Sequence, residues 1–103
     1  MRVALGNVVL ESFDVGTQRS ILRLYRSAPE EALAAAGERL GDITAPALVV
    51  WGERDPYLPT RFAGDYAAAL GGAAEASIVP GAGHWPWLDA PEVVTNVTDF
   101  LVR

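Results

Sequence analysis

The segment Ala47–Trp51 (ALVVW) restricts what this chain can fold into more than any other part of the sequence. It is a continuous apolar run, β-branched in its middle, which follows Pro46 and ends at Gly52. A short apolar run with these boundaries fits a strand that is buried on both faces. Such strands belong to parallel sheets, so the sequence predicts an α/β architecture.

A helix and a second strand follow at the spacing of a β-α-β unit. Thr60 is a candidate helix cap, and Gly71-Gly72 ends the helix that it would start. The apolar residues of this helix recur at helical spacing: Phe62, Ala63, Tyr66, Ala67 and Leu70. Ala76–Val79 then predicts a short strand, closed by Pro80.

The end of the chain has the pattern of an amphipathic helix. Asp89 stands three residues before Glu92, which is the spacing of a capping box, and Pro91 lies in the first turn. We therefore interpret Asp89 as a helix cap and not as a site residue. The apolar side of this helix consists of Val93, Val94, Val97, Phe100 and Leu101.

The amino-terminal part predicts two helices. Apolar residues from Thr17 to Arg26 recur at helical spacing, and Ser27 with Glu30 forms a capping-box pattern for a second helix that ends near Gly41. Val3–Leu10 fits either a strand or an extended arm, because Gly6-Asn7 interrupts it.

Two residues with chemical potential follow the two predicted strands. Asp55 lies in WGERDPYLP just past the first strand, and His84 lies in GAGHW just past the second. A right-handed crossover makes both strands finish at the same edge of the sheet, which is where ligands bind in open α/β folds. A carboxylate beside an imidazole fixes the ring tautomer and stabilises the imidazolium formed when the ring accepts a proton. Asp55 and His84 are therefore the candidate catalytic residues.

Each of these residues also has a structural interpretation. His84 could be a hydrogen-bonded surface histidine, and Asp55 could stabilise the turn before Pro56 by bonding its own backbone. Glu53 and Arg54 are interpreted as solvated turn charges. The three tryptophans are interpreted as packing residues.

The segments APALVVWGERDPYLP and PGAGHWPWLDAPEVV resemble the carboxyl-terminal portion of the α/β-hydrolase family, in the group with epoxide hydrolases, haloalkane dehalogenases and related esterases. The resemblance implies that Asp55, in a G-x-x-D turn, is the acid of a catalytic triad and that His84 is its base. It also implies a partial α/β-hydrolase fold for residues 43–103, a β-α-β-α unit with the last two parallel strands and their flanking helices. Residues 1–42 would then form an amino-terminal arm and helices that resemble the end of the cap region.

The third triad member in that family is a Ser or Asp in a G-x-[SD]-x-G elbow, and this sequence contains no such segment. We therefore expect a hydrolase-family fragment that is inactive alone and takes a small-molecule substrate only if the missing half is supplied. Ester, epoxide and carbon–halogen hydrolysis remain open. The alternative is a non-catalytic module that self-associates, as a homo-oligomer, or pairs with a partner through an exposed sheet edge.

Composition excludes several other classes. The net charge is −5 and all eight basic residues are arginine, without a basic run, so we expect neither nucleic acid nor a membrane as a partner. The chain has no cysteine and one histidine, which argues against metal sites, and we expect no cofactor. The amino terminus has no signal-peptide pattern, and no apolar run approaches the roughly 20 residues of a membrane helix, so we expect a cytoplasmic location.

Overall fold

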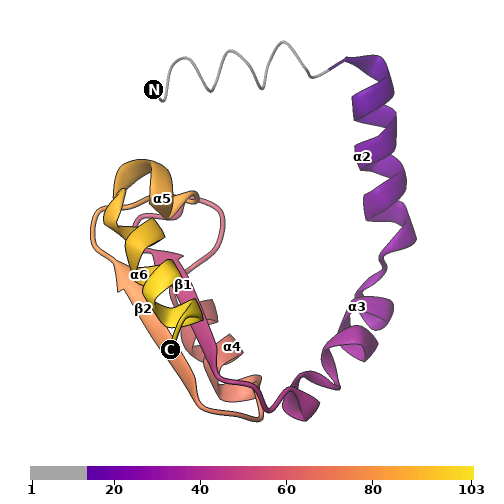
Figure 1. Cartoon of the computed structure of the whole chain (residues 1–103). Coiled ribbons are helices and arrows are strands. Elements are labelled where there is room, and N and C mark those ends of the chain that lie inside the picture. The colour runs from indigo at the N-terminus through magenta and orange to yellow at the C-terminus, as the bar shows by residue number, and fades with distance from the viewer. Residues whose placement is uncertain (1–13) are drawn as a thin grey trace. The chain divides into compact units, whose positions relative to one another are not determined.

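The computed structural model describes residues 14–103 (Figure 1), so the strand or arm predicted at Val3–Leu10 lies outside the described residues. The chain divides between Glu38 and Arg39 into two compact units. The first unit contains the helices α2 (Val15–Ser27) and α3 (Glu30–Gly37). The second unit contains η1 (Leu40–Asp42), β1 (Ala47–Gly52), α4 (Arg61–Ala69), β2 (Ala74–Val79), α5 (Pro86–Asp89) and α6 (Glu92–Leu101).

Helix α2 confirms the predicted helix and extends it at both ends. Asp14 is its N-cap residue, and the Asp14 Oδ1 accepts a hydrogen bond from the backbone N–H of Thr17 at 2.7 Å. This contact satisfies one of the donors that every helix leaves open in its first turn.

No helix among residues 14–103 combines the length and the apolarity that crossing a bilayer requires.

The predicted capping box at Ser27 is wrong. Ser27 is the last residue of α2, where its hydroxyl donates to the carbonyl of Leu24 at 2.8 Å, and the N-cap of α3 is Pro29. Proline disfavours helical backbone at the residue before it, so the chain leaves the helix at Ala28, whose φ is −119°. Helix α3 ends at Gly37 and not near Gly41, and a short 3₁₀ turn follows.

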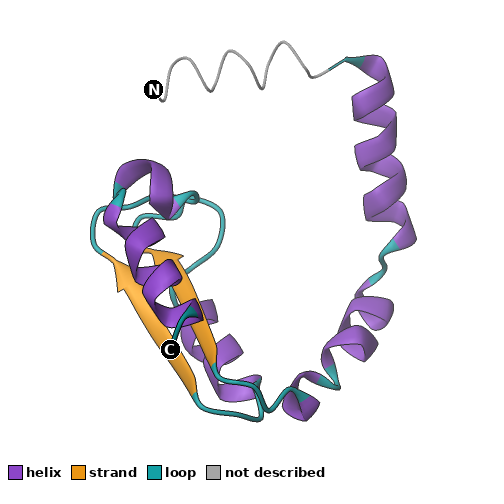
Figure 2. Cartoon of the chain, in the orientation of Figure 1, coloured by secondary structure: helices purple, strands orange, loops and turns teal. Residues whose placement is uncertain are grey.

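The strands β1 and β2 form a parallel pair, which confirms the predicted β-α-β unit (Figure 2). Helix α4 makes the connection between them, as predicted, and β2 begins at Ala74, two residues before its predicted start. The register pairs Val49 with Ala76 and Gly52 with Val79. Both strands therefore end level with each other, and the two loops that follow leave the sheet side by side.

Helices cover the two faces of this sheet, with α6 in front of the strands and α4 behind them in Figure 1. Val50 packs against a buried cluster on the side of the sheet that faces α6. The ring centroid of its neighbour Trp51 instead lies 6.4 Å from that of Phe62 and 6.2 Å from that of Tyr66, both in α4. Successive strand residues point to opposite faces, so one strand serves both layers. The buried cluster on the α6 side consists of Val79, Ala82, Ala90 and Val93, with Val50 and Val97 packed against it.

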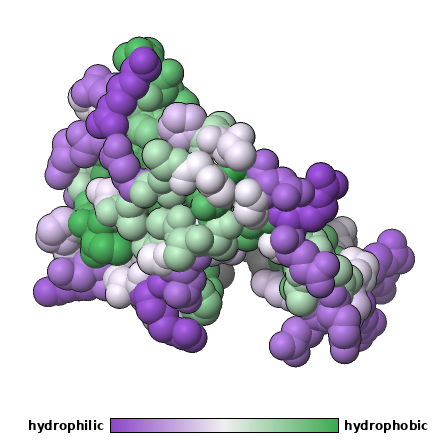
Figure 3. All heavy atoms as spheres, turned by 90° about the horizontal axis from the view of Figure 1, so that it is seen from below, coloured by the Kyte–Doolittle hydropathy of each residue, from purple (hydrophilic) through white to green (hydrophobic). Residues whose placement is uncertain are grey.

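Burial of the sheet is incomplete among the described residues. Ala47–Trp51 are half-buried, not buried on both faces as expected, and residues 75–78 of β2 are exposed. The sheet of the described residues has only two strands, so each strand has one open edge, which leaves the sheet accessible to solvent. Figure 3 shows hydrophobic residues beside hydrophilic ones on the displayed face.

The predicted role of Asp89 as the cap of the last helix is wrong. Asp89 is instead the final residue of α5, a four-residue helix that the sequence pattern did not separate from α6. Helix α6 begins at Glu92, its N-cap residue is Pro91, and no side chain forms a cap hydrogen bond there. The side chain of Asp89 turns to the loop before α5, as described below.

Gly52, at the end of β1, lies directly against the loop that carries His84. A Cβ atom at this position would stand 2.6 Å from the carbonyl oxygen of Ala82 and would also collide with the carbonyl oxygen of Gly83. Both obstacles are backbone atoms, so they could move only if the loop itself moved. The absence of a side chain at residue 52 therefore allows the two loops to approach each other.

We expect Gly52→Ala to lower the free energy of unfolding by about 3 kcal/mol, because overpacking against backbone cannot relax locally. Gly64→Ala is the matched control, since a Cβ at Gly64 in α4 meets nothing within 4 Å and alanine should stabilise the helix by about 1 kcal/mol. Urea unfolding followed by tryptophan fluorescence measures both, because Trp51, Trp85 and Trp87 all lie in the second unit. Equal stability of the two variants would contradict this explanation.

Candidate functional site

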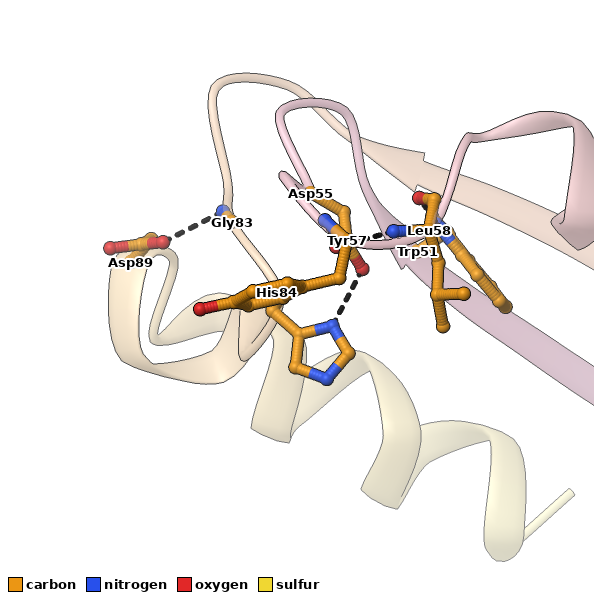
Figure 4. A network of polar contacts seen from close by, with 7 residues as sticks. All are labelled: Trp51, Asp55, Tyr57, Leu58, Gly83, His84 and Asp89. Atoms are coloured by element: carbon orange, nitrogen blue, oxygen red, sulfur yellow. Dashed lines mark hydrogen bonds and ion pairs between the residues drawn. The ribbon is translucent and has the colours of Figure 1, made fainter. Parts of the chain in front are cut away.

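The structure brings the two predicted site residues into direct contact. The Nδ1 atom of His84 lies 2.8 Å from the Oδ2 atom of Asp55, although 29 positions separate the residues in the sequence (Figure 4). Asp55 follows β1 and His84 follows β2, at the edge where both strands end. The side chain of Asp55 is only 5% exposed and that of His84 is 34% exposed.

The second oxygen of Asp55 is held by the loop that carries it. Asp55 Oδ1 accepts hydrogen bonds from the backbone N–H groups of Tyr57 at 2.8 Å and Leu58 at 3.0 Å. Aspartate commonly bonds the backbone two residues on in a turn, so the turn-forming interpretation of Asp55 and its contact with His84 hold together. One oxygen shapes the loop while the other faces the imidazole.

The pKa of Asp55 reflects two opposing effects. Burial acts to raise it, because a charged carboxylate loses hydration. The hydrogen bonds from His84, Tyr57 and Leu58, together with the charge of the ring when protonated, outweigh this and bring the pKa below its ordinary value of 3.8. Asp55 is therefore an ionised carboxylate at neutral pH.

An ionised carboxylate can only accept hydrogen bonds, so the Nδ1 atom of His84 must carry the proton in their contact. In the neutral ring, this leaves Nε2 as the acceptor, and Figure 4 shows that nitrogen on the side of the ring away from Asp55. Two aromatic rings approach the imidazole edge to face: Tyr57 at 5.1 Å and Trp85 at 5.4 Å between centroids. The carboxylate of Asp55 thus orients the ring of His84, and the rings of Tyr57 and Trp85 pack beside it.

Two further contacts hold the loops, and the sequence pattern did not identify either of them. The indole N–H of Trp51 donates to the carbonyl of Leu58 at 3.1 Å, which ties the Asp55 loop to β1. The Oδ2 atom of Asp89 accepts from the backbone N–H of Gly83 at 2.8 Å, one residue before His84 (Figure 4). Both contacts depend on the fold and leave no local spacing signal.

A hollow of about 220 Å³ lies between the sheet and α6, where Leu48, Val93 and Phe100 contribute to its lining, but neither Asp55 nor His84 does. Within residues 14–103, no group of three or more His, Asp or Glu side chains is arranged to hold a metal ion.

We expect Asp55→Asn to destabilise the second unit at neutral pH and to lose this effect in acid. A carboxyl whose pKa is lowered by folding stabilises the folded state above its ordinary value of 3.8, and that contribution disappears as the pH falls through the lowered value. Urea titrations followed by tryptophan fluorescence, from about pH 7 to about pH 3, should therefore show the two stability curves converging in acid.

Asp65→Asn is the control for this titration, because it removes an exposed carboxylate from α4. It should follow the wild-type curve throughout. A difference between wild type and Asp55→Asn that stays constant with pH would contradict the assigned charge on Asp55.

Comparison with known proteins gives one family. The family model described as "Alpha/beta hydrolase family" matches residues 4–97, which is most of the chain. This match and the parallel β-α-β unit confirm the partial α/β-hydrolase fold expected from the sequence. No solved structure shows significant similarity to the chain.

Several curated proteins are similar over part of this sequence. A 2-hydroxy-6-oxononadienedioate/2-hydroxy-6-oxononatrienedioate hydrolase from Klebsiella pneumoniae subsp. pneumoniae is 38% identical over 68 residues, which cover 65% of this chain and 23% of that protein. A hydrolase of the same name from Dechloromonas aromatica is 42% identical over 68 residues, with the same coverage. Epoxide hydrolase 3 from Xenopus tropicalis is 33% identical over 61 residues, covering 58% of this chain and 17% of that protein.

The chain spans less than a quarter of the length of these relatives. The similarity nevertheless includes a family match over most of the chain's own residues. The chain belongs to the α/β-hydrolase family.

Proposed function

We propose that this chain supplies the acid and the general base of a nucleophile–His–acid hydrolytic triad, with Asp55 as the acid and His84 as the base. The observation that carries the proposal is the 2.8 Å contact between His84 Nδ1 and Asp55 Oδ2. Membership in the α/β-hydrolase family supports the proposal, because curated proteins that are similar to this chain are named as hydrolases.

The geometry suits proton transfer at the second ring nitrogen. With Nδ1 donating to Asp55, the Nε2 atom of His84 accepts a proton from a nucleophile or a water molecule, and the carboxylate stabilises the resulting imidazolium. The same nitrogen then returns the proton to the leaving group. Asp55 does not itself take the proton, because its lowered pKa keeps it ionised.

The nucleophile in this proposal comes from outside the 103 residues. The sequence contains no G-x-S-x-G or G-x-D-x-G segment, and the hydroxyls of Ser20 and Ser27 donate to carbonyls of their own helix. Ser77 lies within β2, away from a strand-to-helix turn. The chain alone should therefore lack turnover; completed by the missing half, it would act on a small molecule with an ester, epoxide or carbon–halogen bond.

A chimera tests the roles of Asp55 and His84. The 68-residue segment of the Klebsiella pneumoniae hydrolase that aligns with this chain is replaced by the aligned residues of this chain, and turnover of the relative's named substrate is measured. We expect His84→Gln to lower kcat by about 10³-fold or more and Asp55→Asn to lower it comparably, because both disable the base. Asp65→Asn should leave kcat unchanged.

The unmodified 103-residue chain is assayed in parallel with ester and epoxide substrates. Turnover that His84→Ala abolishes would show that the chain contains its own nucleophile and would overturn the proposed incompleteness. An active chimera that tolerates His84→Gln would overturn the proposed role of His84.

A second candidate function is assembly through a sheet edge, with a second copy of the chain as the partner. It is favoured by the open edges of the sheet, because each described strand pairs on one side only. Residues 75–78 of β2 are also exposed, with Ile78 41% exposed. Unpaired edges offer open N–H and C=O groups to another strand.

If this second function holds, size-exclusion chromatography with light scattering should give a dimer whose fraction rises with concentration. A charged residue on the exposed edge strand opposes such pairing, so Ile78→Lys should restore the monomer. A monomer at every concentration for the unmodified chain would exclude assembly as a function.

A further inference from the structure

The loop that carries His84 is held at three consecutive positions by residues outside it. The backbone N–H of Gly81 donates to Glu53 Oε1 at 3.2 Å, and the carbonyl of Ala82 accepts from the N–H of Arg54 at 2.8 Å. The N–H of Gly83 donates to Asp89 Oδ2 at 2.8 Å. Three consecutive residues before the imidazole therefore each have a fixed backbone contact.

The contact with Asp89 differs from the other side-chain contact in three ways. It is partly buried, whereas the bond from Gly81 to Glu53 is exposed, and it is shorter by 0.4 Å (3.2 − 2.8). It also involves the residue directly before His84. Charge-assisted hydrogen bonds of this length are stronger than neutral ones, and partial burial reduces competition from water.

The place of Asp89 in the fold explains how it reaches this loop. Helix α5 begins at Pro86, two residues after His84, and Asp89 closes its single turn. The carboxylate therefore points back across the turn to Gly83, as Figure 4 shows. Buried Ala82 and Ala90 lie next to the two bonded residues, at 1% and 8% exposure, so both ends of the bridge rest on the core.

We propose that Asp89 is a positioning residue for His84: its carboxylate fixes the Gly83 amide and thereby sets the direction in which the imidazole leaves the loop toward Asp55. The catalytic consequence rests on the proposed function, but the effect on the ring does not. Capping of α6 does not account for Asp89, because the cap of that helix is Pro91 without a side-chain hydrogen bond.

The single histidine makes a direct test available in the full 103-residue chain. In ¹⁵N-labelled protein, the imidazole signals belong to His84 alone and report which nitrogen carries the proton. We expect the wild type to show the Nδ1–H tautomer, and Asp89→Ala to show a mixture of tautomers with Nδ1–H exchange at least about 10-fold faster. Asp89→Asn should remain close to wild type, because an amide oxygen still accepts from Gly83.

Two further variants separate positioning from general destabilisation. Glu92→Ala removes a negative charge from the exposed first turn of α6 and should leave the His84 signals unchanged. Asp89→Glu keeps the charge but displaces the carboxylate, so exchange of the His84 Nδ1–H should be faster than in the wild type. This variant keeps the test available if Asp89→Ala does not fold. A folded Asp89→Ala or Asp89→Glu protein with wild-type tautomer and exchange would overturn the proposal.

The chimera described above supplies the catalytic readout. There, Asp89→Ala should lower kcat by about 10- to 100-fold with little change in KM, as expected for a misplaced catalytic group, and Asp89→Asn should recover most of it. Failure of the proposed function appears differently, as turnover that survives His84→Gln. The tautomer measurement in the 103-residue chain stands in either case.

Discussion

The parallel pairing of β1 with β2 is the interaction on which the rest of the second unit depends. Because Gly52 is in register with Val79, both strands end at the same level and the chain continues as two adjacent loops. Backbone hydrogen bonds extend this pairing past the strands, from Glu53 N–H to the Val79 carbonyl at 3.0 Å and from Arg54 N–H to the Ala82 carbonyl at 2.8 Å. These backbone hydrogen bonds bring the two loops together, and the closeness of Asp55 and His84 in space follows from them.

The two loops are stabilised by different means. The Asp55 loop folds around its own carboxylate, which bonds two backbone amides, and an indole from β1 holds its far end. The His84 loop has no such internal anchor and depends on neighbours, namely the turn after β1 on one side and α5 on the other. Asp55 is thus placed mainly by its own loop, and His84 is placed by contacts of its loop with the turn after β1 and with α5.

This difference also explains what could be predicted from the sequence. The apolar run Ala47–Trp51 and the following helix specify a parallel crossover, and topology then implies that Asp55 and His84 meet, without any knowledge of distances. Their contact was predictable because both residues directly follow strands. Their catalytic roles stay predictions.

The errors arose where a local pattern competed with another contact. Asp89 and Glu92 have capping-box spacing, yet Asp89 bonds Gly83 and a separate short helix forms before Pro91. Ser27 and Glu30 have the same spacing, but Pro29 between them determines the helix start. Asp14, three residues before Thr17, shows a real cap that the apolar periodicity did not reveal. A capping pattern indicates a polar side chain that can bond a backbone amide, but the packing of the fold determines which amide it bonds.

The anchoring of the two loops has a consequence for substitutions near Asp55 and His84. Trp51 holds the loop of Asp55 to β1, whereas Asp89 holds the loop of His84 to α5, and the bond from the Arg54 N–H to the Ala82 carbonyl joins the two loops. A substitution in either outer anchor therefore acts on a joined pair of loops and not on one loop alone.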